Sequence, residues 1–369
     1  MIHAAIVGCG VIAPTHAKAL EIDGRAALRW ACDPILASAT RVAALLPGAR
    51  PTTSLADVLG DPQVQVVHVC TPHHTHADIA CAALAAGKHV VCEKALATTP
   101  ADVTRMVRAA AAAPRLVASG IFQHRFSPLA RRLRELVLGG DFGRVERITV
   151  SFACTRTAGY YASGPWRGTW AGEGGGLLIN QGIHTLDSAL GFLGEPLTVA
   201  ASMSRTRVAT IEVEDAVRLT ATGRGGAVLS FAADNDQVTD WANRIEVQAG
   251  AGRFVLRTDE HLDQLEHPNA ALCSELWALE HLDMNAAAVK MPGKACYGDH
   301  HALQIQDCLS AVAAGRRPFV DFAAAAIPNR VVLAAYHSAA TGGAPVALDT
   351  LDSLTFSRPS LTAAASTGA

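Results

Sequence analysis

Apolar and polar positions alternate in a regular way through the first third of the chain. Short apolar runs end in glycine or in a polar residue, and longer stretches with helical spacing follow them. Strands that alternate with helices form βαβ units, so this pattern predicts a parallel sheet that is covered on both faces. The predicted strands are 3–9, 27–33, 64–71, 88–94 and 115–122, and the predicted helices are 11–20, 34–46, 76–87 and 101–113.

The pattern changes after about residue 122. A helix is predicted over 127–140, a strand over 145–155, and an apolar helix over roughly 177–193. Strand-like segments then follow one another with few helices between them, which is typical of an antiparallel or mixed sheet. These strands are 196–205, 216–223, 227–235, 244–250 and 252–258, and the last helices are expected at about 300–314 and 323–340.

Composition narrows the class of protein. Half of the 369 residues are hydrophobic, and the net charge is −2, so the chain can bury a large core and offers no basic surface for nucleic acid. No secretory leader is visible at the N-terminus, and no apolar run reaches the roughly 18 residues of a membrane span. The nine cysteines contain no CxxC pair, which favours reduced, buried thiols over a zinc site. We therefore expect a cytoplasmic protein.

The first loop carries a dinucleotide-binding pattern. The sequence from Gly8 to Ala13, GCGVIA, follows a strand and opens a helix. In such a turn Gly8 permits the bend, Gly10 lets a pyrophosphate approach, and the helix N-terminus faces the phosphates. Asp33 ends the second strand, where a carboxylate would accept hydrogen bonds from ribose hydroxyls. The alternatives are a glycine turn that binds nothing and, for Asp33, a helix cap.

Two further strand ends lie on the ligand side of the predicted sheet. Thr71 and Pro72 end the third strand, and we expect them to line the crevice. Three histidines stand within four positions here, but no carboxylate or cysteine completes a metal set, so His76 is expected to cap or pack the next helix. Glu93 and Lys94 end the fourth strand. Lys94 either holds a substrate oxygen or is a surface lysine.

The apolar helix near 177–193 carries a polar stripe. Asn180, His184 and Asp187 are spaced i, i+4 and i+7, which places them on one helical face. Buried polar groups must be hydrogen-bonded, so the stripe is either a structural network or a site. His184 can take or give a proton near neutral pH.

Three motifs together resemble one protein family. GCGVIAPTHAKAL, CTPHHTHADIACAALAAGKHVVCEKALA and GGGLLINQGIHTLD, in this order, resemble the glucose-fructose oxidoreductase, inositol dehydrogenase and rhizopine-catabolism (Gfo/Idh/MocA) family. The similarity extends to 297–303 and 315–318. It implies an α/β Rossmann domain over 1–122 and an α+β domain with a large open, mostly antiparallel sheet over 123–350. A partly disordered tail is expected over 351–369, and a nicotinamide cofactor is expected between the two domains.

The resemblance also implies an activity. Most members transfer a hydride between nicotinamide and a hydroxyl or keto carbon of a sugar, cyclitol or sugar derivative. The family's active-site lysine falls on Lys94, and its histidine falls on His184, which we expect to be the general acid and base. Asn180 and Asp187 then position hydroxyls. The alternatives are a glycosidase-like enzyme that retains NAD and oxidises transiently, and a non-catalytic, cofactor-sensing regulator.

The chain departs from the family pattern in two places. Ala95 replaces the proline of the Glu-Lys-Pro motif, so we expect a trans bond or a strained loop after Lys94. Asn180 stands where inositol dehydrogenase-like members commonly have Asp. An amide cannot titrate, so Asn180 is expected to orient His184 or to bind a hydroxyl.

Binding residues are expected from several segments of the chain. Asp33 favours NAD, with NADP as the alternative, because its charge repels a 2′-phosphate, although Arg25, Arg29 and Arg41 would weaken that preference. No metal is expected. The expected cofactor contacts are Gly8, Gly10, Val11, Ile12, Asp33, Thr71, Pro72, His76, Glu93, Lys94 and Gln123. The expected substrate contacts are Asn180, Asp187, Tyr161, Trp166, Arg167, Arg156 and His124.

The aromatic segment before the polar helix has two interpretations. Tyr160, Tyr161, Trp166 and Trp170 lie close together in a chain with only 5% aromatic residues. Aromatic faces stack on sugar C–H surfaces, but such a cluster also suits a core or a subunit interface. A sheet with one face left uncovered predicts an exposed apolar surface and therefore a homodimer or homotetramer. The expected partners are a polyol or sugar and a second copy of the chain, not nucleic acid or a membrane.

Overall fold

The computed structural model describes residues 1–257, 261–281 and 298–361. Cys296, Tyr297 and the end of the expected tail, 362–369, lie outside the described residues. The chain divides into two compact units. The first comprises Met1–Ala97, Ala101–Phe126 and Asp283–Ile327, and the second comprises Thr98–Pro100, Ser127–Leu282 and Pro328–Ala369.

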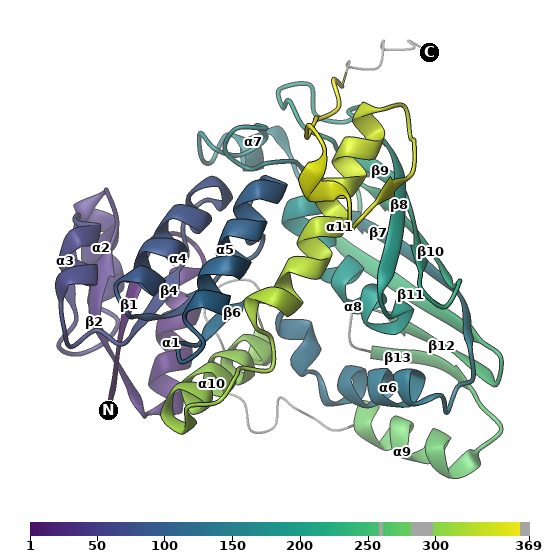
Figure 1. Ribbon diagram of the computed structural model, residues 1–369, viewed down its shortest axis with the longest axis horizontal. Helices are drawn as coiled ribbons and strands as arrows, with labels where there is room; N and C mark the ends of the chain where they lie inside the picture. Colours follow the sequence, from purple (N-terminus) through teal and green to yellow (C-terminus); the bar gives the residue numbers. More distant parts are fainter. Residues whose placement is uncertain (258–260, 282–297, 362–369) are drawn as a thin grey trace. The chain divides into compact units, whose positions relative to one another are not determined.

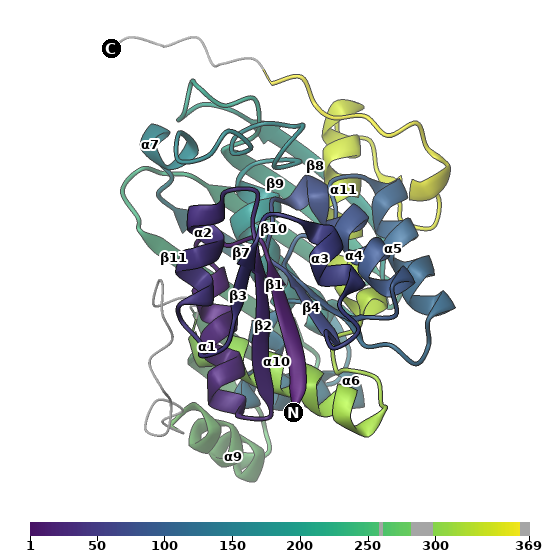
Figure 2. The same ribbon diagram turned by 90° about the vertical axis from the view of Figure 1, so that its left-hand side faces the viewer.

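A six-stranded parallel sheet forms the first unit (Figure 1). Its strand order, β3-β2-β1-β4-β5-β6, is that of a doubly wound dinucleotide-binding fold. Figure 2 shows β1 and β2 side by side, with α1 and α4 on opposite sides of them. The strands are β1 (Ile2–Val7), β2 (Ala26–Cys32), β3 (Arg50–Thr52), β4 (Val66–Val69), β5 (His89–Cys92) and β6 (Ala118–Gly120). The helices are α1 (Ala13–Asp23), α2 (Leu36–Ala43), α3 (Leu55–Gly60), α4 (His76–Ala85), α5 (Pro100–Ala112) and α10 (Gly298–Ala314).

The predicted elements of this unit are present, with bounds that differ from the predicted ones by up to three residues. Every residue of β4 is buried, as expected of a strand that is covered on both faces. Helix α1 begins with Pro14 in its first turn and ends at Gly24 with a left-handed φ of 68°. The edge strand β3 and the short helix α3 escaped prediction because three and six residues give too little periodicity.

Helix α10 belongs to the first unit although it lies near the end of the chain. Gln304 on α10 accepts a hydrogen bond from Phe122 N at 2.9 Å and donates one to Gly120 O at 2.8 Å. Ile305 and Leu309 join the apolar core that contains Leu20. The described residues 298–327 thus fall with the N-terminal segment in the division of the chain by contacts, a return that the expected ranges 1–122 and 123–350 do not include.

An eight-stranded sheet forms the second unit (Figure 1). Its order is β13-β12-β11-β7-β10-β9-β8-β14, and only the β7–β10 pair is parallel. The strands are β7 (Val145–Cys154), β8 (Pro196–Ser204), β9 (Ala216–Gly223), β10 (Val228–Asp234), β11 (Trp241–Ala249), β12 (Gly252–Arg257), β13 (His261–Glu266) and β14 (Val346–Ala347). The helices are α6 (Pro128–Gly139), α7 (Ala158–Tyr161), α8 (Ile183–Leu193), α9 (Ala270–Glu280) and α11 (Phe322–Ala340), which begins in the first unit.

Burial alternates along the strands of this sheet. Ile148 and Val150 of β7 point into the core, while Thr149 and Ser151 are exposed. Hydroxyl and charged residues occupy the equivalent exposed positions of neighbouring strands: Ser202, Arg218, Thr220 and Ser230. The uncovered face is therefore more polar than predicted, with Val228 among its few exposed apolar side chains.

The end of the described chain is anchored within the second unit. Arg358 donates to Thr98 O at 3.1 Å, and its guanidinium lies 6.0 Å from the Trp170 ring centre. The described part of the predicted tail therefore packs against its own unit.

Two general features bear on function. No helix among the described residues is long and apolar enough to cross a membrane. Within the same residues, no group of three or more His, Cys, Asp or Glu side chains is arranged to hold a metal ion.

Candidate functional site

The two glycines of the first turn have different surroundings. Gly8 has a φ of 91°, and a Cβ atom there would lie 2.6 Å from the carbonyl carbon of Cys70. No side chain fits this approach of β1 to β4. Gly10 is exposed, and its Cβ direction is open. Since α1 has no acidic residue in its first turn, the backbone at 10–12 is open to an anion.

Asp33 connects the end of β2 to this turn. Its Oδ2 accepts a hydrogen bond from Cys9 N at 2.8 Å, and its Oδ1 accepts one from Ile35 N at 2.9 Å. Helix α2 begins only at Leu36, with Ile35 as its N-cap, so Asp33 is not the helix cap. Each carboxylate oxygen keeps a second lone pair for further donors.

Only one of the three nearby arginines contacts the turn. Arg41 donates to Cys9 O at 3.0 Å. Arg25 and Arg29 form ion pairs with Asp23 and Asp61 instead. Of the three, Arg41 is therefore the one positioned to weaken the effect of the Asp33 charge.

His76 holds two loops at the carboxyl ends of the strands. Its Nε2 lies 2.7 Å from Thr71 O, and its Nδ1 lies 2.8 Å from Ala95 O. Burial lowers the pKa of His76, while the two carbonyl contacts oppose that shift. Because both ring nitrogens face backbone oxygens, His76 connects the loops rather than offering a free nitrogen to a ligand. Thr71 and Pro72 themselves are partly exposed beyond β4.

The loop after β5 is anchored on both sides of Lys94. Ala95, Leu96 and Ala97 are buried, whereas Lys94 is partly exposed. The peptide bond between Lys94 and Ala95 is cis, so the expected trans bond is not found. The buried position of Ala95 and the His76 contact with its carbonyl hold this loop where the family motif has a proline.

Glu93 is buried among histidines. His16 Nε2 lies 3.0 Å from Glu93 Oε1, and His301 Nε2 lies 3.7 Å from the same oxygen. Burial alone would raise the pKa of Glu93, but the contacts with His16 and His301 hold it well below its usual range. These contacts do not support the expected binding of a cofactor by Glu93, because its carboxylate faces histidines and the Lys94 amide.

The polar helix of the second unit begins with an unusual turn. A π-helical segment, η3 (Leu178–Gly182), precedes α8, so Asn180 and His184 are not separated by regular α-helical spacing. π-Helical turns occur frequently at functional sites. The predicted stripe is therefore only partly regular, although all three of its members, Asn180, His184 and Asp187, are buried.

Glu214 caps this helix. Its carboxylate accepts hydrogen bonds from Gly176 N and Leu178 N, both at 2.9 Å, and from Tyr336 Oη at 2.9 Å. Burial raises the pKa of Glu214 to about 7. Gly175 has a φ of 155°, and a Cβ atom there would collide with the Tyr336 hydroxyl. Only glycine at this position lets the Tyr336 side chain lie so close to the backbone.

Asn180 contacts a carboxylate that the sequence did not reveal. Its Nδ2 donates to Glu173 Oε1 and, at 3.1 Å, to Tyr160 Oη. Glu173 is 1% exposed, and its other oxygen accepts from Gly168 N at 2.6 Å. Because the amide nitrogen faces Glu173, the Asn180 carbonyl oxygen is turned to other donors. Glu173 directly precedes the three glycines, which was the only signal of its position.

The two tyrosines of the aromatic segment differ. Tyr160 Oη accepts from Arg167 Nη1 at 2.6 Å and Gln181 Nε2 at 3.0 Å. Tyr161 is buried in a cluster with Val208, Ile211 and Val213. Tyr160, and not the predicted Tyr161, is thus the member that contacts the polar helix.

The predicted arginines flank Tyr160. The Arg156 and Arg167 guanidiniums lie 5.0 and 4.5 Å from the Tyr160 ring centre, and Arg167 also lies 4.3 Å from that of Trp166. The structure therefore brings Arg156, Trp166 and Arg167 into one cluster with Asn180.

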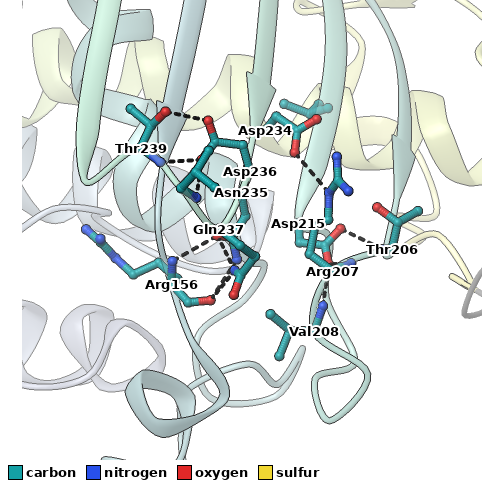
Figure 3. Close-up of polar contacts among 12 residues, drawn as sticks. Arg156, Thr206, Arg207, Val208, Asp215, Asp234, Asn235, Asp236, Gln237 and Thr239 are labelled. Carbon is teal, nitrogen blue, oxygen red and sulfur yellow. Dashed lines mark hydrogen bonds and ion pairs between the residues drawn. The ribbon is translucent and has the colours of Figure 1, made fainter.

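Backbone contacts fix Arg156 in place (Figure 3). Arg156 N donates to Asn235 Oδ1, and Asn235 Nδ2 donates back to Arg156 O, both at 2.8 Å. Figure 3 shows the guanidinium pointing away from Asn235. In the neighbouring loop, the Asp215 carboxylate accepts from the backbone amides of 206–208 at 2.6–2.9 Å. These two sets of contacts hold the Arg156 backbone and the 206–208 loop separately.

His124 and Gln123 lie in the first unit, in the 3₁₀ helix η2 (Gln123–Phe126). Their side-chain nitrogens are 3.4 Å apart. Lys94 likewise belongs to the first unit, whereas His184, Asn180 and Asp187 belong to the second.

The doubly wound order of the parallel sheet is typical of dinucleotide-binding domains, and a second unit with a large mixed sheet accompanies it here. The chain belongs to the Gfo/Idh/MocA family. The family model described as an oxidoreductase family with an NAD-binding Rossmann fold matches residues 2–121, and the family's C-terminal domain model matches 130–255.

Several named proteins are similar to this chain. Inositol 2-dehydrogenase 2 of Saccharopolyspora erythraea is 29% identical over 55% of this chain and 57% of its own length. D-glucoside 3-dehydrogenase of Escherichia coli is 34% identical over 52% of this chain and 54% of its own length. The chain spans about half the length of these curated relatives.

A solved structure is similar over nearly the whole chain. The WlbA dehydrogenase of Chromobacterium violaceum, in complex with NADH and UDP-GlcNAcA, has a TM-score of 0.83 and 26% identity, and the match covers 94% of this chain and 95% of that one.

The first unit has features that fit a dinucleotide. The open backbone at Gly10 and the helix α1 N-terminus suit a pyrophosphate, and the Asp33 oxygens suit ribose hydroxyls. Gly8, Gly10, Val11, Ile12 and Asp33 are the residues of this turn that would hold it.

Proposed function

We propose that the chain is an NAD-dependent dehydrogenase that acts on a hydroxyl or keto carbon of a sugar, cyclitol or sugar derivative. The observation that carries this proposal is the Gly-rich turn with Asp33 beside it, in a chain that matches both models of the family. Lys94 and His184 are the catalytic residues that the resemblance in sequence implies. The names of the relatives support a polyhydroxylated substrate.

The protein's own groups divide the proton chemistry. A bound nicotinamide would accept or supply the hydride. His184 removes the proton from the substrate hydroxyl and returns it in the reverse direction. Lys94 donates a hydrogen bond to the same oxygen and stabilises its developing negative charge.

Residues of the second unit position the substrate. Asn180, Asp187, Arg156, Trp166 and Arg167 remain our proposed contacts. Glu173 and Tyr160 fix the Asn180 amide, so its carbonyl oxygen is an acceptor for a substrate hydroxyl. His124 and Tyr161 stay proposals from the sequence: His124 lies beside Gln123 in the first unit, and Tyr161 packs in the apolar cluster of the second.

An absorbance screen at 340 nm tests the activity. The purified protein is mixed with NAD or NADP and with a panel of polyols, sugars and nucleotide sugars. Net NADH formation with at least one of them is expected. Cleavage of a glycoside without net NADH would instead support the NAD-retaining alternative. Cofactor binding with no turnover on any compound would support the cofactor-sensing regulator.

Substitution of the two proposed catalytic residues tests their roles. His184→Ala and Lys94→Ala should each lower kcat by about 10²–10⁴, while the Kd for NADH changes little. His261→Ala and Lys18→Ala replace an exposed histidine and a surface lysine, and they serve as controls that keep normal kcat. Near-normal kcat in folded His184→Ala protein would refute the proposed base.

We propose a homodimer or homotetramer as the assembled form. Support comes from the broad uncovered face of the eight-stranded sheet, although that face is polar. Light scattering should give a mass of at least twice 38.4 kDa at micromolar concentration. A mass of one chain would overturn this proposal.

A cytoplasmic location is also proposed. None of the eight cysteines among the described residues forms a disulfide bond, and six of them are buried. Burial raises the pKa of Cys9 to about 12, so this thiol stays protonated and unreactive. Free thiols of this kind suit a reducing compartment.

A further inference from the structure

A buried histidine cluster in the first unit has no role in the proton chemistry above. His68 on β4 and His16 on α1 have their Nδ1 atoms 2.9 Å apart, and the other nitrogen of His16 faces Glu93. Both histidine side chains are fully buried. Burial, with His16 close by, holds the pKa of His68 well below its usual range, so His68 is neutral.

The hydrogen positions in this cluster follow from its partners. Glu93 is ionised, so His16 Nε2 carries a proton and donates to Glu93 Oε1. The remaining His16 nitrogen and His68 Nδ1 share a second hydrogen bond, so Glu93, His16 and His68 form one connected chain. The cluster thereby holds the Glu93 carboxylate in one position beneath the turn after β5.

The same carboxylate reaches the next residue along the chain. Glu93 Oε2 accepts from Lys94 N at 3.2 Å, and Glu93 N donates to Val69 O on β4 at 2.9 Å. On the other side of Lys94, His76 contacts the Ala95 carbonyl. Within residues 90–98, Lys94 alone is not buried. Lys94 is thus the one accessible residue in a segment that histidines fix at both ends.

We propose that His16 and His76 are positioning residues for Lys94: His16 acts through Glu93, and His76 acts through the Ala95 carbonyl. This inference rests on the proposed function, in which Lys94 contacts a substrate oxygen. Displacement of a reacting group by about 1 Å costs roughly 100-fold in rate, so precise anchoring of this loop has a chemical consequence.

Substitutions that retain a donor separate positioning from general packing. His16→Ala and His76→Ala should lower kcat about 10- to 100-fold, with the KM for NAD changed less than threefold. His16→Gln and His76→Gln keep an amide donor and should recover most of kcat. His89→Gln is the matched control, because His89 lies on the same strand β5 and accepts only from Val117 N at 2.8 Å. It should lose stability without losing kcat.

A second readout does not depend on turnover. The chain has five lysines, so labelling of Lys94 by an amine-reactive reagent can be followed by mass spectrometry, with Lys18 as the internal reference. In His16→Ala and His76→Ala, the relative rate at Lys94 should change several-fold, whereas His89→Gln should leave it unchanged. Should the alanine variants not fold, His16→Leu and His76→Leu, which fill more of the space and still lack a hydrogen-bonding group, take their place in this comparison.

The outcomes distinguish this inference from the proposed function. If kcat and Lys94 labelling in folded His16→Ala and His76→Ala match those of the control, the positioning role is overturned. If Lys94→Ala keeps normal turnover while labelling still changes in the histidine variants, the anchoring of Lys94 stands and its catalytic role fails.

Discussion

The two sheets carry their candidate chemistry in different places. In the parallel sheet, Gly8, Thr71 and Lys94 all follow the carboxyl ends of strands. In the mixed sheet, Asn180 and His184 lie instead on a helical segment that packs against strands β7, β10 and β11. Parallel strands bring their carboxyl ends to one edge, whereas antiparallel strands send alternate ends to opposite edges. A sheet of the second kind needs a covering helix to gather its functional residues.

The two regions also satisfy their buried carboxylates differently. Glu93 is held by histidine side chains, whereas Glu214 is held by two backbone amides and a tyrosine hydroxyl. Titratable partners lower the pKa of Glu93, while burial raises that of Glu214 to about 7. Glu93 therefore stays ionised near neutral pH, whereas Glu214 gains or loses a proton in that range.

The largest effect on stability is expected from a substitution in the turn that follows β1. Gly8→Ala combines a positive φ with a Cβ atom 2.6 Å from the Cys70 backbone, so it should lower the free energy of unfolding by about 3–5 kcal/mol. Gly10→Ala enters open space and should change stability little, while still weakening NADH binding. Urea unfolding and NADH fluorescence on both variants test this. Equal stability of the two would contradict the described turn.

A second prediction concerns the cap of the polar helix. The raised pKa of Glu214 means that the folded state holds a proton that the unfolded chain releases above about pH 4.5. The contribution of this proton to the free energy of unfolding is fully present below about pH 4.5. It is lost as the pH rises through about 7, by roughly 3 kcal/mol in total. Glu214→Gln cannot ionise and should lack this loss.

Urea unfolding at pH 5 and pH 8 measures the difference. The wild type should become less stable relative to Glu214→Gln at the higher pH. Glu212→Gln, at an exposed neighbour in the same segment, serves as the control and should follow the wild type at both pH values. Parallel pH dependences of wild type and Glu214→Gln would show that Glu214 keeps an ordinary pKa.

The smallest expected effect lies at the end of β2. Asp33→Ser removes a charge beside the turn and should raise kcat/KM for NADP relative to NAD by about tenfold, which corresponds to about 1.4 kcal/mol. Arg41→Ala should shift the ratio toward NAD, since Arg41 is the basic side chain at the turn. A wild-type enzyme that already prefers NADP would contradict the proposed role of Asp33.

Local patterns were sufficient for most of the fold. The apolar runs and the glycines that end them gave strands β1, β2, β4 and β5 and their helices, because burial on both faces leaves a continuous signal. Strand β13 and helix α9 were missed, since the mixed pattern of 261–280 has no clear period. The lysine and the histidine came from family motifs, and their roles stay predictions.

What the sequence determined by itself is the set of elements and the Gly-rich turn, because periodicity and glycine placement act within a few residues. Only the tertiary structure decided that Glu173 contacts Asn180, that Glu214 caps the π-helical turn, and that His16 and His76 anchor the residues beside Lys94. These partners are 7 to 77 positions apart in the chain. A buried polar group selects its partner by proximity in the folded core, where it must be satisfied, and no local pattern records that choice.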